Sequence, residues 1–265
     1  MEYCGILGHP LKKPRSIKIW KSFFRKNKIK CDMRGFDVKP KNLEKFFLHI
    51  KKDKYFLASA ITMPYKIVSK NFIKNLDNYA KYSGAANLII KKNKKLNGFN
   101  TDIHGALKSI GNNIKLHKNI TVIGYGGTGS AILKYLLKKY KKNYLLVSKK
   151  NKHPNIVEKK CKIVKKLLKN ELKKKQLIIN CTPLGSDLKL SFLNKTPLNK
   201  NQLKDLNRES FIFDIVYKPR KTQLAKLCNS FKINYKNGLE MNTFQAEIAI
   251  NLLIKNLSFF KNCIN

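Results

Sequence analysis

A glycine-rich turn between an apolar run and an amphipathic segment constrains this chain more than any other stretch. The run Ile120–Ile123 is followed by Gly124, Tyr125, Gly126, Gly127, Thr128 and Gly129, which fit G-x-G-x-x-G. Apolar residues then recur at helical spacing, at Ile132, Leu133, Leu136, Leu137 and Tyr140. The pattern predicts a strand, a turn and a helix, with the backbone N–H groups of the turn and helix N-terminus facing a dinucleotide pyrophosphate. The plain alternative is an ordinary strand-to-helix turn.

The residues after the next apolar strand bear on which dinucleotide would bind. A site of the NAD type places Asp or Glu there, against the ribose 2′-hydroxyl. Following Tyr144–Val147, this chain instead has Ser148, Lys149 and Lys150. Two cations suit a 2′-phosphate, so NADP is favoured over NAD, although adjacent lysines also arise by chance in so lysine-rich a chain.

The formal charge of +42 on 265 residues would ordinarily suggest a nucleic acid or an anionic membrane as partner. Only five of the 57 basic residues are Arg, and the lysines are spread through every segment beside abundant Asn and Ile, as in the products of AT-rich genomes. The basic runs carry no interleaved aromatic platform and no zinc-finger spacing, so specific nucleic-acid recognition is not expected. Non-specific polyanion binding stays open.

The six cysteines show neither C-x-x-C pairs nor zinc-ligand spacing with His, which favours free thiols in a reducing cytoplasm. The chain starts with a strand-like segment, Tyr3–Leu7, rather than a signal peptide, and no apolar run reaches transmembrane length. We therefore expect a soluble cytoplasmic protein, monomeric or homodimeric, that uses no metal.

Strand-like and helix-like segments alternate in the first hundred residues: Tyr3–Leu7, Ile17–Phe24, Met33–Val38, Asn42–Ile50 and Phe56–Ile61. This alternation predicts a largely parallel sheet covered by helices, with ligands at the carboxyl ends of the strands. A lysine-rich hairpin follows Leu88–Ile90, and residues 107–118 would cross to the glycine-turn strand. Near the C-terminus a helical apolar face is expected from Phe244, Ile248, Ile250, Leu252, Leu253 and Leu257.

Short polar motifs follow the predicted strands, and each has a bland interpretation when taken alone. Pro64 could end a strand, and Asp102 could cap the helix expected over Ile103–Ile110. Their order along the chain is more specific: Gly8–Ser16, Thr62–Lys66, Gly84–Asn87, Asn100–Asp102, Gly124–Gly129, Ile179–Gly185, Asp214–Pro219, and Asn237–Met241 with Gln245. This ordered set closely resembles the shikimate dehydrogenase family over essentially the whole chain.

The resemblance implies an α/β fold with an N-terminal substrate domain and a central Rossmann domain that binds NADP. The expected boundaries are 1–106 for the substrate domain, 107–237 for the Rossmann domain, and 238–265 for a C-terminal helical segment that packs back on the substrate domain. The active site would lie in the cleft between the two domains.

The family reduces 3-dehydroshikimate to shikimate with NADPH, reversibly, on the route to chorismate and the aromatic amino acids. By the resemblance, Lys66 is the catalytic lysine and Asp102 its partner. A lysine is almost fully protonated at neutral pH and can donate a proton to a carbonyl oxygen. Because a nearby carboxylate favours the ammonium form, Asp102 is expected to orient Lys66 and to bind a substrate hydroxyl.

Residue-by-residue matching to the family extends the expected site. The shikimate pocket would be lined by Ser16, Thr62, Asn87, Asp102, Tyr217 and Gln245. The cofactor would contact Gly124, Gly126, Gly127, Thr128, Gly129 and Ser130 at the pyrophosphate, Ser148, Lys149 and Lys150 at the 2′-phosphate, and Ile215 and Gly238 at the nicotinamide.

Several positions depart from the family pattern. The S-x-S pair for the substrate carboxylate reads Pro14-Arg15-Ser16, and N-R-T reads Ser148-Lys149-Lys150. Other departures are Ala60 for Asn, Ser130 for Arg and Glu240 for Gly. Two alternatives are therefore kept: a quinate/shikimate dehydrogenase with looser substrate and NAD use, and a non-catalytic paralogue that binds polyanions.

Overall fold

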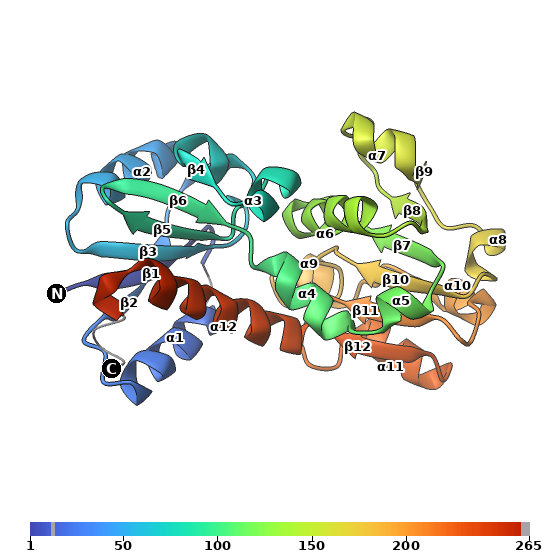
Figure 1. Ribbon diagram of the computed structural model, residues 1–265. Coiled ribbons are helices and arrows are strands. Elements are labelled where there is room, and N and C mark those ends of the chain that lie inside the picture. Colours follow the sequence, from blue (N-terminus) through green and yellow to red (C-terminus); the bar gives the residue numbers. More distant parts are fainter. Residues whose placement is uncertain (12–13, 261–265) are drawn as a thin grey trace. The chain divides into compact units, whose positions relative to one another are not determined.

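The structure is a computed structural model that describes residues 1–11 and 14–260 (Figure 1). It divides into two compact units, one made of Met1–His104 with the chain from Thr243 onward, the other of Gly105–Asn242. The divisions fall inside two helices, α4 (Asp102–Ile110) and α12 (Leu239–Asn256), a few residues from the expected boundaries at 106 and 237. The end of the expected C-terminal segment, 261–265, lies outside the described residues.

The first unit contains a six-stranded sheet of order β2-β1-β3-β5-β6-β4. Its strands are β1 (Tyr3–Gly8), β2 (Asp32–Asp37), β3 (Phe56–Ile61), β4 (Asn75–Leu76), β5 (Leu88–Lys92) and β6 (Lys95–Phe99). Strands β1, β2 and β3 are parallel, as predicted, and β5 and β6 form the expected antiparallel hairpin, but β5 also runs antiparallel to β3. The connection from β5 to β6 is only two residues, Asn93 and Lys94, both at positive φ, and so short a turn can join only antiparallel strands. The sheet is therefore mixed.

Both faces of this sheet are covered by helices, because alternate strand residues point to opposite faces. On one face, Cys4 and Ile6 share a buried core with α1 (Arg15–Lys26) and α12; on the other, Tyr3 and Leu7 share one with α2 (Leu43–Lys52) and α3 (Asn78–Ser83). Short 3-10 turns lie at Pro40–Asn42 (η1) and Val68–Phe72 (η2). Of the expected apolar face of α12, Ile250, Leu253 and Leu257 are buried in the first of these cores, whereas Phe244, Ile248 and Leu252 are half-buried.

The second unit is a wholly parallel sheet of order β12-β11-β10-β7-β8-β9. Its strands are β7 (Asn119–Ile123), β8 (Asn143–Val147), β9 (Lys162–Val164), β10 (Gln176–Asn180), β11 (Phe211–Asp214) and β12 (Asn234–Asn237). The chain winds outward from β7 in one direction and from β10 in the other, which is the doubly wound nucleotide-binding order. The crevice for a ligand in such a sheet lies at the carboxyl ends of β7 and β10.

Helix α5 (Asn113–Leu116) precedes β7. The helices between the strands are α6 (Gly127–Lys139), α7 (Asn155–Lys160), α8 (Lys169–Leu172), α9 (Leu190–Leu193), α10 (Lys200–Asp205) and α11 (Gln223–Ser230). Helix α6 begins at the third residue after Gly124, as the glycine turn predicts, and ends at Lys139, one residue before the expected Tyr140. Within residues 1–11 and 14–260, no helix is both long enough and apolar enough to span a bilayer.

Asp214, at the end of β11, is a buried carboxylate inside the second unit. Its oxygens accept hydrogen bonds from Asn180 Nδ2 (2.8 Å), the Val216 N–H (3.0 Å) and the Tyr235 hydroxyl (3.0 Å). Burial nevertheless dominates and raises the pKa of Asp214 to about 6, because the charged form is poorly solvated.

The raised pKa of Asp214 predicts a pH-dependent stability. Between the ordinary value of 3.8 and about 6, the folded state holds a proton that the unfolded state has lost, so the free energy of unfolding falls as the pH rises. Relative to Asp214→Asn, the wild type should lose about 2–3 kcal/mol of stability from about pH 4 to about pH 7. Urea unfolding of both proteins at several pH values measures this difference, and parallel pH profiles would contradict it.

Candidate active site and cofactor cradle

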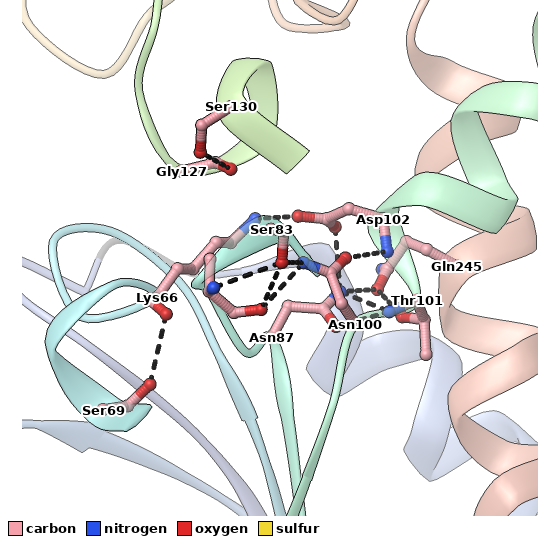
Figure 2. Close-up of polar contacts among 11 residues, drawn as sticks. Lys66, Ser69, Ser83, Asn87, Asn100, Thr101, Asp102, Gly127, Ser130 and Gln245 are labelled. Carbon is pink, nitrogen blue, oxygen red and sulfur yellow. Dashed lines mark hydrogen bonds and ion pairs between the residues drawn. The ribbon is translucent and has the colours of Figure 1, made fainter. Parts of the chain in front are cut away.

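An ion pair between Lys66 and Asp102, largely shielded from solvent, lies at the centre of the candidate active site. Lys66 Nζ is 2.6 Å from Asp102 Oδ2, and the two side chains are 19% and 7% exposed (Figure 2). Charges this poorly hydrated persist only when paired and hydrogen-bonded. Both residues belong to the first unit, so the pair forms within one compact body.

The two strands that flank β5 bring these residues together although they are 36 positions apart. Lys66 lies in the turn that follows β3, and Asp102 is the first residue of α4, three residues after β6. Strand β5 pairs with both β3 and β6, which aligns the ends of those strands. The turn is tied to the start of β5, since the Ala86 N–H donates to the Lys66 carbonyl at 2.8 Å.

The Asn87 side chain joins this pair to the rest of the cluster. Its Nδ2 lies 2.8 Å from Asp102 Oδ1, 2.9 Å from Thr101 Oγ1 and 3.5 Å from Gln245 Oε1, and its Oδ1 accepts from the Thr101 N–H at 2.7 Å. An amide nitrogen has two protons, so three acceptors exceed its capacity. The Gln245 contact is the longest of the three, and Gln245 also accepts from the Thr101 hydroxyl at 3.3 Å. The structure thus brings together three of the predicted site residues, Asn87, Asp102 and Gln245.

Further side chains, which were not among the predicted site residues, support this cluster. Asn100 Nδ2 donates to Ser83 Oγ (3.1 Å) and to the Ala85 carbonyl (2.9 Å), while its Oδ1 accepts from the Asp102 N–H at 3.2 Å. Thr101 is also buried. The N-T-D motif contained the signal, because both residues directly precede Asp102, but only the contacts reveal their roles in positioning Asn87 and Asp102.

The remaining pocket candidates of the first unit occupy strand and helix ends. Ser16 is buried in the first turn of α1, and Thr62 follows β3 with its N–H bonded to the Leu7 carbonyl at 2.8 Å. Pro14 stands at the N-cap of α1 and offers no side-chain hydrogen bond there. Arg15 Nη1 donates to Thr243 Oγ1 of α12 at 3.0 Å, while Lys13 lies outside the described residues.

The glycine turn of the second unit has the geometry expected of a phosphate cradle. Gly124 has φ +95°, and a Cβ on Gly129 would come within 2.2 Å of the Gly124 carbonyl oxygen. A Cβ on Gly126 would meet nothing within 4 Å, so the backbone there is open to a ligand. The N-terminus of α6 follows at Gly127, with Gly126 as its N-cap. Gly124 therefore makes the tight turn, Gly126 leaves the backbone open to a ligand, and Gly129 allows the close packing of the helix, as the pattern predicts.

Ser130, which stands where the family has Arg, is buried, and its hydroxyl donates to the Gly127 carbonyl at 3.0 Å (Figure 2). The Ser130 side chain therefore forms a hydrogen bond with the backbone of its own helix. Thr128 is half-buried beside it. The anion-binding donors of this turn are then expected to be mainly backbone N–H groups, with no arginine side chain to add charge.

The loop after β8 carries the candidates for the 2′-phosphate. Ser148 is buried, and its Oγ accepts from the Lys150 N–H (3.1 Å) and lies 3.0 Å from His153 Nε2. Lys149 and Lys150 are exposed, and Lys150 Nζ lies 5.6 Å from the centroid of the Tyr125 ring in the glycine turn. The structure thus adds His153 and Tyr125 to this region; the sequence offered no motif for His153.

The nicotinamide candidates Ile215 and Gly238 also come together. A Cβ on Gly238 would lie 2.2 Å from the Ile215 carbonyl oxygen, so only glycine allows this approach. Tyr217 follows β11 in the second unit. Glu240, another departure from the family, pairs with Lys236 at 2.7 Å.

These features fit NADP. The backbone at Gly126 is open, since an added Cβ would meet nothing within 4 Å. The helix N-terminus and the lysines supply positive potential, and no carboxylate stands at Ser148–Lys150 to favour a ribose 2′-hydroxyl. Among the described residues there is no group of three or more His, Cys, Asp or Glu side chains placed to hold a metal ion.

Comparison with known proteins agrees with this geometry. Residues 6–89 match the family described as "Shikimate dehydrogenase substrate binding domain". The curated "Shikimate dehydrogenase (NADP(+))" of Clostridium beijerinckii is 33% identical over 250 residues, covering 93% of this chain and 89% of that protein.

Solved structures show the same fold. The Thermus thermophilus shikimate 5-dehydrogenase in complex with NADP(H) and shikimate has a TM-score of 0.82 at 21% identity, over 100% of this chain and 98% of that one. The Listeria monocytogenes enzyme in complex with shikimate and NAD has a TM-score of 0.78 at 21% identity, over 100% and 96%. The predicted fold class and family are confirmed: the chain belongs to the shikimate dehydrogenase family of NADP-dependent oxidoreductases.

Proposed function

We propose that this protein catalyses the reversible reduction of 3-dehydroshikimate to shikimate with NADPH, within the pathway to chorismate and the aromatic amino acids. The observation that carries the proposal is the Lys66–Asp102 pair at 2.6 Å, joined to Asn87 in one hydrogen-bonded cluster. The cluster offers a proton donor, a carboxylate and amide groups, which are the groups that a hydroxylated keto acid requires.

The chemistry divides between cofactor and protein. The glycine turn and the Ser148–Lys150 loop would hold NADPH, which would supply the hydride. Lys66 donates the accompanying proton to the ring carbonyl oxygen, and because its side chain is 19% exposed, water can return a proton afterwards. Asp102 holds the ammonium in place through the ion pair at Oδ2. Its other oxygen, Oδ1, accepts a hydrogen bond from Asn87 and is the one that would accept from a substrate hydroxyl. In the reverse direction Lys66 accepts the proton.

The substrate would be held by hydroxyl and amide groups and one carboxylate of the first unit, and by one side chain of the second. We assign this role to Ser16, Thr62, Asn87, Asp102 and Gln245, with Tyr217 from the second unit. Asn87 and Gln245 are each fixed by contacts with Thr101, which limits the entropy lost when a hydroxyl group binds. We likewise assign the domain roles: substrate recognition to 1–106 with the C-terminal segment 238–265, and cofactor binding to 107–237.

Steady-state rates with shikimate and with quinate, each with NADP and with NAD, test the proposal. We expect the highest kcat/KM for shikimate with NADP. Comparable rates with quinate or with NAD would instead indicate the broader quinate/shikimate activity, an alternative that the NAD complex of the Listeria relative makes worth testing.

The same preparation tests the non-enzymatic alternative, which the +42 charge motivates. A polyanion-binding paralogue would bind nucleic acid with a steep salt dependence and would oxidise no shikimate with either cofactor. Turnover of shikimate contradicts that alternative whether or not such binding is seen, and its complete absence contradicts the proposed function.

A further inference from the structure

Lys165, the first residue after β9, is bonded to the loop that carries the 2′-phosphate candidates. Its Nζ lies 3.2 Å from the Lys149 carbonyl oxygen, 3.2 Å from the Lys150 carbonyl oxygen and 3.0 Å from Asn151 Oδ1. The preceding residue also contacts this loop, because the Val164 carbonyl accepts from the Ser148 N–H at 3.0 Å. All of these residues belong to the second unit.

The geometry indicates that Lys165 positions the loop rather than binding the phosphate itself. A protonated lysine amine has three N–H donors and accepts no hydrogen bond. Three oxygens of residues 149–151 surround the Lys165 ammonium, one for each donor. The ammonium therefore has no donor left for a phosphate while it holds the loop, unlike the side chains of Lys149 and Lys150.

The backbone that Lys165 holds sets the positions from which the Lys149 and Lys150 side chains extend. Within the loop, the Lys150 N–H is bonded to Ser148 Oγ, and the Lys150 ammonium lies over the Tyr125 ring of the glycine turn at 5.6 Å. Both lysines are exposed, so few packing contacts of their own would fix the loop. Without the three Lys165 bonds the loop would lose order, and cofactor binding would then have to restore that order.

We propose that Lys165 is a positioning residue for recognition of the 2′-phosphate: it holds the backbone of the Ser148–Asn151 loop and thereby contributes to the preference for NADP over NAD. This inference rests on the proposed function, because it requires Lys149 and Lys150 to contact that phosphate. Neither motif spacing nor the family pattern points to Lys165, which is one lysine among many in this chain.

Replacing Lys165 with methionine tests the inference, with dissociation constants of NADP and NAD measured by calorimetry on the full-length protein. We expect the NADP dissociation constant to rise about 3- to 10-fold, which is less than the loss of a direct hydrogen bond to the phosphate would cause, because Lys165 acts only through the loop; the NAD constant should stay within about 2-fold. Lys165→Arg should restore most of the NADP affinity, because a guanidinium has five N–H donors.

Lys166→Met is the matched control, because Lys166 is the adjacent exposed residue and the substitution removes the same charge. If Lys166→Met weakens NADP binding as much as Lys165→Met, the effect is one of general charge and the inference is wrong. An equal loss of NADP and NAD affinity in Lys165→Met would also overturn it.

The double variant Lys149→Ala/Lys150→Ala separates failure of this inference from failure of the proposed cofactor site. If the double variant loses NADP affinity selectively while Lys165→Met does not, the phosphate site stands and only the role of Lys165 is refuted. If both the double variant and Lys165→Met keep the wild-type preference for NADP over NAD, the phosphate assignment itself is wrong. The inference about Lys165 is then wrong as well.

Discussion

Replacing Lys66 with alanine is expected to lower kcat by about 10²- to 10⁴-fold, the usual contribution of a general acid or base. The ammonium that lies 2.6 Å from Asp102 is then missing, and with it the proton for the reacting oxygen. The NADP dissociation constant should hardly change, because the glycine turn belongs to the other compact unit. Loss of kcat with retained cofactor binding would place the defect in the chemical step.

Lys70→Ala gives the control for this experiment. Lys70 is exposed in η2, four residues further along the chain, so its substitution removes a charge from the same region and should leave kcat near the wild-type value. Since alanine at position 66 leaves the Asp102 carboxylate without its cation, unfolding should be followed in parallel, and Lys66→Gln offers a variant that keeps a hydrogen-bond donor. Wild-type kcat in either Lys66 variant would refute the mechanism even if the fold is correct.

The double variant Lys149→Ala/Lys150→Ala is expected to raise the KM for NADP by about 10- to 100-fold, while the KM for NAD changes little. Only NADP carries the 2′-phosphate, and a hydrogen bond to a charged group contributes about 1.5–3 kcal/mol, or roughly one to two powers of ten in affinity. Because both lysines are exposed, the effect should shrink as the salt concentration rises.

A matched control removes two adjacent exposed lysines elsewhere in the same unit. Lys173 and Lys174 shortly precede β10 and therefore lie at the amino end of the sheet, away from the carboxyl ends that bind ligands. Lys173→Ala/Lys174→Ala should leave the ratio of the two KM values unchanged. If this control variant raises the KM for NADP as much as the loop variant does, Lys149 and Lys150 act only as surface charge.

The sequence alone determined the strand, turn and helix at the start of the second sheet, because the signals there are local. The strand over Asn119–Ile123 and the helix from Gly127 follow from apolar periodicity and from what three glycines permit in a turn. The ordered motifs likewise indicated the family, and the same motifs supplied Lys66, Asn87 and Asp102 as candidates. The strand, turn and helix need only residues that are near one another in the chain, whereas the family was indicated by the order of motifs along the whole chain.

Only the tertiary structure decided which of the candidates touch and what holds them. The Lys66–Asp102 distance depends on the pairing of β3, β5 and β6, and strand register cannot be obtained from periodicity within one strand. The contacts of Asn100 with Ser83 and of Lys165 with the 149–151 loop join residues 14 to 17 positions apart, and in so lysine-rich a chain Lys165 has no compositional signal. Their roles come from three-dimensional proximity, which a sequence pattern does not contain.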